Sequence, residues 1–126
     1  MAEQKTVAVV GASADRTKFS NKAVRAYVAH GWKVIPINPK GGDIEGIPVA
    51  TSLSDVKDKI DRVTLYLSPD RGLALISDIA GAKPDEFFVN PGAESDALIE
   101  AARGQGLDPI QACSIIEVGA SPADFD

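Results

Sequence analysis

The stretch KTVAVVGAS, residues 5–13, decides the fold of this chain. Its unbroken run of small and β-branched apolar residues is typical of a strand that is buried on both faces, as parallel strands are. Gly11 then allows a sharp turn, and Ser20 or Asn21 is placed to cap the helix that follows. The stretch therefore predicts a strand, a turn and a helix whose N-terminus favours a phosphate group.

The turn after this strand matches only half of a dinucleotide-binding fingerprint. The pattern G-x-G-x-x-G needs two more glycines, whereas the sequence after Gly11 reads ASADR at residues 12–16. We therefore expect either a longer loop or a loop that is built for a different phosphate ligand.

Length and composition limit the class of protein. A chain of 126 residues with 44% hydrophobic content is sized for one core, so we expect one domain at residues 1–118 and a loose tail at 119–126. The single cysteine, Cys113, excludes an internal disulfide, and with only one histidine, His30, a Cys/His metal cage is not expected. The sequence has no signal-peptide pattern and no apolar run near the roughly 20 residues of a membrane span, so we expect a soluble, cytoplasmic protein without a membrane partner.

Charge is distributed unevenly along the chain. The net charge of −5 argues against a nucleic-acid partner. Residues 16–40 nevertheless contain six basic and no acidic residues, while all 18 acidic residues lie elsewhere. This asymmetry indicates a local anion site, and the alternative is a solvated helix face with ordinary loop lysines. Lys18 and Lys22 fit the first reading, because a bound anion would offset their unfavourable position near a helix N-terminus.

Hydrophobic periodicity predicts alternating strands and helices. Further strands are expected at residues 32–37, 62–67, 86–89 and 108–112. Helices are expected at 21–30, at 52–60 with a capping box from Ser52 to Asp55, from Pro69 to Gly81, and from about residue 95 to Gly104. His30 is expected to cap a helix end rather than to act as a catalyst. The residues expected to face the core from these helices are Ala23, Val24, Tyr27, Val28, Leu53, Val56, Ile60, Leu73, Ile76, Ile79, Ala97, Leu98, Ala101 and Ala102.

This order predicts an α/β fold, a Rossmann-like three-layer α-β-α sandwich with a five-stranded parallel sheet. Ligands of such sheets bind beyond the carboxyl ends of the strands, at the point where the strand order reverses. The rule selects the loops after Val10, Ile37, Leu67 and Val89.

The end of the second strand discriminates between ligands. An NAD-binding domain normally has an acidic residue here to accept from the ribose hydroxyl, whereas this chain has Asn38-Pro39-Lys40. A lysine suits a ribose that carries a phosphate, as in NADP or in the 3′-phosphorylated ADP of coenzyme A (CoA). The alternative is a plain turn, because Asn-Pro often begins one.

Several spaced motifs together resemble a known family. They are VVGAS at residues 9–13, KFSNK at 18–22, GWKVIPINPK at 31–40, and GIPV at 46–49 followed by Ser52-Leu53. In these motifs the chain is similar to the CoA-binding domain family, small stand-alone bacterial proteins that resemble the N-terminal domain of the succinyl-CoA synthetase α subunit. The resemblance extends to about Val118.

The resemblance implies CoA as cofactor and gives each matching loop a role. Gly11, Ala12, Ser13, Lys18, Phe19, Ser20 and Asn21 would surround the phosphates. Asn38, Pro39 and Lys40 would hold the adenine ribose end, with Lys40 at the 3′-phosphate. Leu67, Ser68 and Pro69 match a Val-Pro-Pro segment of the synthetase, from which Ser68 departs. Asn90, Pro91 and Gly92 would lie near the pantetheine arm, and Cys113 is where the stand-alone proteins often have a cysteine.

The resemblance also limits the activity. The synthetase needs a second domain with a phosphorylated histidine, which this sequence does not contain, so we expect a non-catalytic carrier, sensor or regulatory module for CoA or an acyl-CoA. The alternatives are a CoA-dependent enzyme that uses Cys113 and a domain that binds NADP or another nucleotide. A homodimer or an unknown protein partner is compatible with each.

Overall fold

One parallel sheet organises the computed structural model, which describes residues 4–126. Its strands are β1 (Thr6–Val10), β2 (Lys33–Ile37), β5 (Arg62–Leu65), β6 (Glu86–Val89) and β7 (Pro109–Gln111), in the order β2-β1-β5-β6-β7. The helices are α1 (Phe19–Ala29), α2 (Pro69–Ala74), α3 (Ile76–Ala82), α4 (Asp96–Gly104) and α5 (Ser114–Glu117). The smaller elements are the hairpin β3 (Asp43–Ile44) and β4 (Ile47–Pro48) and the 3-10 turns η1 (Leu53–Asp55) and η2 (Pro122–Phe125). The predicted Rossmann-like α/β architecture is confirmed.

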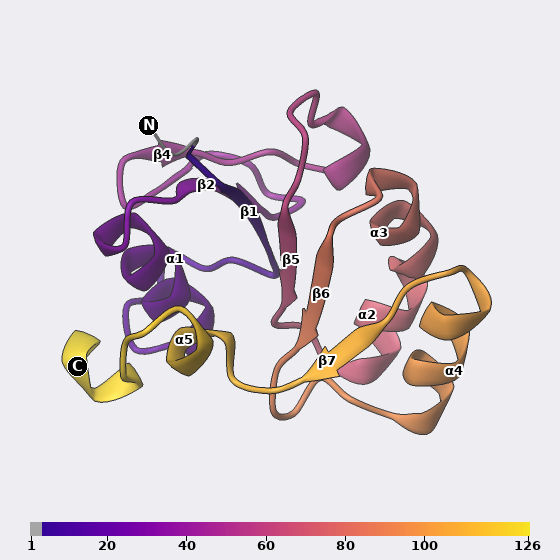
Figure 1. Cartoon of the computed structure of the whole chain (residues 1–126). Coiled ribbons are helices and arrows are strands. Elements are labelled where there is room, and N and C mark those ends of the chain that lie inside the picture. The colour runs from indigo at the N-terminus through magenta and orange to yellow at the C-terminus, as the bar shows by residue number, and fades with distance from the viewer. Residues whose placement is uncertain (1–3) are drawn as a thin grey trace.

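Helices cover both faces of the sheet, with α1 and α5 on one face and α2, α3 and α4 on the other (Figure 1). The side chains of β1 alternate between the two layers, as the pleat of a strand requires. Val7 and Val9 pack against the α1 side, whereas Ala8 and Val10 pack against the other side. All four are buried, so the apolar run at residues 7–10 forms the centre of the molecule.

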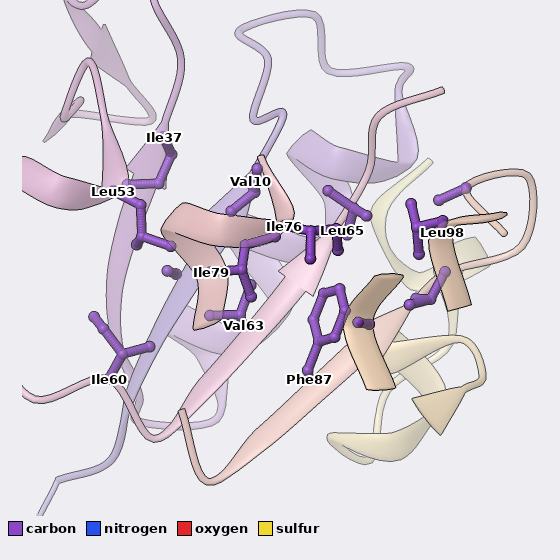
Figure 2. Packing of buried hydrophobic residues seen from close by; sticks show 14 of the residues in the cluster. Val10, Ile37, Leu53, Ile60, Val63, Leu65, Ile76, Ile79, Phe87 and Leu98 are labelled. Carbon is purple, nitrogen blue, oxygen red and sulfur yellow. The ribbon is translucent and has the colours of Figure 1, made fainter. Parts of the chain in front are cut away.

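The larger core lies between the sheet and the helices α2 to α4. Figure 2 shows Ile76 and Ile79 of α3 over Val63 of β5, with Phe87 and Leu98 beside them. Each of these side chains is 2% exposed or less. Burial of one such side chain contributes about 1.5–3 kcal/mol, so this face fixes the helices firmly on the sheet.

The strand order reverses next to β1. The chain passes from β1 outward to β2 and then returns across β1 to β5, with every pairing parallel. The loops after β1 and β5 therefore diverge to opposite faces and leave a crevice at the carboxyl edge, where ligands bind in folds of this kind.

Two predicted helices differ from those observed. At residues 52–60 only the turn η1 forms, because the predicted capping box is incomplete. The Ser52 hydroxyl accepts from the Ser54 N–H. The Asp55 carboxylate accepts from Thr51 Oγ1 at 3.3 Å and not from the backbone N–H of Ser52. Leu53 and Ile60 are nevertheless buried as predicted.

The helix predicted from Pro69 to Gly81 is instead two helices, α2 and α3, which meet at Leu75. Pro69 is the first residue of α2, as predicted. Three residues that were expected to face the core, Val28, Leu73 and Ala97, are exposed, because each lies at the border of its apolar stripe, next to positions that fill the core.

The last residues of the chain pack against α1, although the sequence predicts a loose tail. The turn η2 lies beside α1, with the Arg25 guanidinium 5.5 Å from the ring centre of Phe125 and Lys22 paired with Asp126. These pairs join residues that are far apart in the sequence, so local composition could not indicate them.

Candidate functional site

Two clefts lie next to each other along the carboxyl edge of the sheet. The larger, of about 780 Å³, lies over the ends of β1 and β2, and the smaller, of about 420 Å³, lies over the ends of β5 and β6 and reaches Cys113. The residues Lys18, Ser20, Tyr66 and Leu67 line both. The clefts therefore form one continuous depression that can hold an extended ligand.

Most of the residues predicted for a ligand site line these clefts. The larger cleft is lined by Gly11, Ala12, Ser13, Lys18, Ser20, Asn38, Pro39, Lys40 and Leu67. The smaller cleft is lined by Lys18, Phe19, Ser20, Leu67, Ser68, Asn90, Gly92 and Cys113. Asn21 and Pro69 line neither cleft. Asn21 instead bonds to the loop after β1, and Pro69 is the first residue of α2.

The sequence reasoning missed several polar residues of the larger cleft, which are Thr51, Ser52, Tyr66, Arg71 and Asp78. The sequence predicts Tyr66 inside a strand, but β5 ends at Leu65, so Tyr66 lies at the edge of the sheet. Arg71 and Asp78 lie on α2 and α3. Their i, i+7 spacing is the one signal that could have placed both on the same side of a helical segment.

Gly11 brings the loop after β1 close to the end of β5. Its φ of +87° is a conformation that L side chains rarely adopt, and an added Cβ would lie 2.8 Å from the Tyr66 carbonyl oxygen and 2.8 Å from Leu67 Cδ2. Two amides of this loop, those of Gly11 and Ala12, donate to the Ile37 carbonyl at 3.1 and 3.2 Å. The turn is thus held between its two neighbouring strands, and only glycine fits there.

Asn21 holds the loop between β1 and α1 in place. Its amide nitrogen donates to the Ser13 carbonyl at 2.9 Å, and its amide oxygen accepts from Arg25 Nε at 2.8 Å. Arg25 also donates to the Arg16 carbonyl at 2.9 Å. Asn21 is completely buried and lines neither cleft, so it positions the loop and does not cap α1.

The N-terminus of α1 faces the junction of the two clefts without a side-chain cap. Lys18 holds the N-cap position, no side chain accepts a hydrogen bond there, and the first turn has no acidic residue. Lys18 and Ser20 line both clefts. The N–H groups and positive dipole end of a helix attract anions, and the first turn of α1 supplies none, although the Asp15 carboxylate accepts from the Thr17 N–H just before the helix.

Asn38 connects the loops that follow β1 and β2. Its amide nitrogen donates to the Ala12 carbonyl at 2.8 Å, and its amide oxygen accepts from the Lys40 N–H at 2.8 Å. Asn38 therefore fixes the turn, while Lys40 is exposed at the margin of the larger cleft. Within residues 4–126, neither Lys18 nor Lys40 forms an ion pair.

The remaining basic residues of the segment 16–40 have other contacts. Arg16 pairs with Glu45 at 3.4 Å, and Lys33 and Lys22 pair with Asp58 and Asp126. Ion pairs with acidic residues from other parts of the chain thus occupy Arg16, Lys22 and Lys33. Of the basic residues in this segment, only Lys18 and Lys40 line the clefts. Arg71, from outside the segment, joins them in the larger cleft.

A buried polar network supports the smaller cleft. The Asn90 amide nitrogen donates to Thr64 Oγ1 at 2.6 Å and to the Leu65 carbonyl at 3.0 Å, and its oxygen accepts from the Ser114 N–H at 2.9 Å. The Ser114 hydroxyl lies 2.7 Å from Thr64 Oγ1 and 3.2 Å from the Tyr66 hydroxyl. Asn90, which was predicted to lie near a ligand, therefore lines the cleft with its hydrogen-bonding groups already committed.

Cys113 lies at the margin of the smaller cleft, at the N-cap position of α5, and is half-buried with a free thiol. The Ser114 contacts to Asn90 and Thr64 fix the start of α5. His30 is the C-cap residue of α1, at the opposite end of that helix from the clefts. No histidine base therefore stands beside the thiol in the described part of the chain.

Two kinds of feature are absent from residues 4–126. Within that range no group of three or more His, Cys, Asp or Glu side chains could hold a metal ion. Within the same range no helix has the length and apolar character to cross a membrane.

Solved structures share this fold over nearly the whole chain. An uncharacterised protein is 26% identical with a TM-score of 0.82, over 93% of this chain and 96% of its own. A protein from Thermus thermophilus is 24% identical with a TM-score of 0.82, over 90% of this chain and 87% of its own, a similarity that shows the fold alone.

A larger enzyme contains a similar domain. The dinucleotide forming acetyl-coenzyme A synthetase 1 of Ca. Korarchaeum cryptofilum, in complex with phosphate and ADP, is 28% identical with a TM-score of 0.75. The match covers 86% of this chain and 26% of the synthetase chain. The model of the family described as CoA binding domain matches residues 5–119. The chain therefore belongs to the CoA binding domain family.

Proposed function

We propose that the chain binds CoA or an acyl-CoA along the two clefts and acts as a carrier, sensor or regulatory module without chemistry of its own. The observation that carries this proposal is the continuous depression from Lys40, past the uncapped start of α1, to Cys113. Membership of the CoA binding domain family supports the class of ligand. A module of this kind would act through a protein partner or a second copy of the chain.

The charges of the clefts suggest how CoA would lie. The diphosphate would face the start of α1 and the turn at Gly11–Ser13, because N–H groups and a positive dipole end meet there. The 3′-phosphate would pair with Lys40, with Arg71 as a second cation in the same cleft. The pantetheine arm would then run over Leu67 into the smaller cleft.

The environment of Cys113 supports a binding role over an enzymatic one. A reactive cysteine needs a nearby base or cation that favours the thiolate. His30 lies at the far end of α1, and Cys113 itself lies at the start of α5, a helix of only four residues. Lys18 lines the same cleft as Cys113 but is exposed to solvent. Its ammonium group would therefore stabilise a bound phosphate at least as well as a thiolate at Cys113.

Titration calorimetry with CoA, dephospho-CoA, NAD and NADP tests the proposal. CoA is expected to bind more tightly than dephospho-CoA, because a charged hydrogen bond contributes about 1.5–3 kcal/mol. Lys40 is exposed and screened by salt, so we expect the lower end of that range, about a tenfold difference in Kd. Lys40→Gln should remove most of this difference, with Arg71 as the remaining cation of the cleft.

Lys57→Gln is the matched control, because Lys57 is also an exposed lysine but lines neither cleft. It should leave the preference unchanged. Equal affinity of the wild type for CoA and dephospho-CoA would refute the assignment of Lys40. Tighter binding of NAD or NADP than of CoA would refute the class of ligand and favour a nucleotide-binding domain.

A further inference from the structure

Three hydroxyl groups beneath the smaller cleft share only two contacts. Thr64 Oγ1 lies 2.7 Å from Ser114 Oγ, and Ser114 Oγ lies 3.2 Å from the Tyr66 hydroxyl. Thr64 Oγ1 also accepts from the Asn90 amide nitrogen at 2.6 Å. Each hydroxyl carries one proton, so one of the three protons must point out of this network.

Burial decides which proton that is. Thr64 and Ser114 are completely buried, and an unpaired donor there would cost the full desolvation penalty of the group. Tyr66 lines both clefts. The arrangement that leaves no buried proton unpaired runs from Asn90 to Thr64, from Thr64 to Ser114 and from Ser114 to the Tyr66 oxygen. The phenolic proton of Tyr66 is then the donor that is left for a ligand.

We propose that Tyr66 donates this hydrogen bond to the carbonyl oxygen of an acyl-CoA thioester, so that the smaller cleft selects acyl-CoA over free CoA. The inference rests on the proposed function and deepens it by naming the form of the cofactor. The thioester carbonyl is a hydrogen-bond acceptor, whereas the thiol of free CoA is a weak one. Tyr66 is a specificity-determining residue in this role and takes part in no reaction.

Two properties of the smaller cleft fit a thioester. Its lining includes the apolar side chains of Phe19, Leu67, Pro91 and Ala93, which suit a short acyl group. Burial raises the pKa of Tyr66 well above its ordinary value of 10.0. The phenol therefore keeps its proton, and so remains a donor, throughout the neutral range.

The test compares two ligands that differ in one group. Acetyl-CoA and S-ethyl-CoA are similar in size, but only acetyl-CoA has the carbonyl. Calorimetry on the wild type should give acetyl-CoA an affinity about 2- to 12-fold higher, the range of a neutral hydrogen bond. Tyr66→Phe keeps the ring and should bring this ratio to one.

Tyr27→Phe is the matched control, because the other tyrosine of the chain is buried with its hydroxyl bonded to Arg62 and lines neither cleft. It should keep the wild-type ratio. As a second measurement, the infrared stretch of a ¹³C-labelled acetyl carbonyl should shift to lower frequency on binding to the wild type and should shift less with Tyr66→Phe.

Two results of these titrations would overturn the proposed role of Tyr66. A wild-type ratio of one would overturn the role of Tyr66, and this comparison holds even if Tyr66→Phe is unstable. A ratio above one that persists in Tyr66→Phe would also overturn it. Both results would leave CoA binding itself intact. Failure of the wild type to bind any of the three ligands, CoA, acetyl-CoA and S-ethyl-CoA, would overturn the proposed function as well.

Discussion

At the scale of single residues, Gly11 connects the fold to the site. The apolar run before it forms the central strand, and its positive φ turns the chain where an added Cβ would meet the Tyr66 carbonyl. The same residue thus sets the distance between the loops after β1 and β5. Those loops line both clefts, so a change at Gly11 should affect stability and ligand binding together.

Gly11→Ala should destabilise the protein by about 2–4 kcal/mol, because the substitution adds a steric conflict with backbone to the cost of a positive φ. Chemical denaturation measures this change. Gly42→Ala is the matched control, since Gly42 has a similar φ of +84° but open space around it, and it should cost about 1 kcal/mol. Equal losses for the two variants would mean that the close approach at Gly11 contributes nothing.

Single residues also show what sequence could and could not predict about the site. Lys40 and the turn at Gly11 follow from local patterns, because strand ends and turn residues have local signatures. Asn21 looks like a cap by the same rules, yet it is buried and bonded to Ser13 and Arg25. That use depends on the path of the loop, which local propensity does not encode.

At the scale of elements, the start of α5 depends on the end of β6. Asn90 bonds to the Ser114 N–H, the Leu65 carbonyl and Thr64 Oγ1, and all four residues are buried. This amide joins β5, β6 and α5 beneath the smaller cleft. The position of Cys113 at the cleft margin is therefore set by a polar contact across the sheet rather than by the local sequence.

Asn90→Ala should lower the free energy of unfolding by about 2–4 kcal/mol, because it leaves the buried Ser114 N–H unpaired and removes the donor to Thr64 Oγ1. Thermal and chemical denaturation measure this loss. Gln105→Ala is the control, since Gln105 is an exposed amide with one hydrogen bond, to Ser77, and its loss should change stability by less than about 0.5 kcal/mol. A similar small effect of Asn90→Ala would contradict the structural role of this network.

Elements with strong periodicity were predicted, whereas weak ones were not. The buried strands β1 and β6 have continuous apolar runs that leave little ambiguity. The segment after Ser52 has apolar residues at helical spacing, but only η1 forms, and Asp58 beyond it pairs with Lys33. Burial of Leu53 and Ile60 could thus be predicted from the pattern, although the backbone conformation between them could not.

At the scale of the whole molecule, the strand order creates the site. Reversal beside β1 opens one edge of the sheet, and the residues gathered there come from six separate parts of the chain, from the loop at Gly11 to Cys113. The site is therefore a product of topology, which the alternation of strands and helices predicts. The polar residues Arg71 and Asp78 line the larger cleft only because α2 and α3 are turned with these side chains toward it. The alternation of strands and helices does not predict how a helix is rotated about its axis.

Amide chemical-shift mapping by NMR tests most directly whether CoA occupies the joined clefts. Addition of CoA to the ¹⁵N-labelled chain should shift the amide signals of Gly11, Ser20, Lys40 and Cys113, which span the depression from end to end. The signal of Gln105, at the C-terminus of α4 and outside both clefts, should not move. Absence of any shift at saturating CoA, or shifts that gather around α4 with none at the carboxyl edge, would contradict CoA binding at this site.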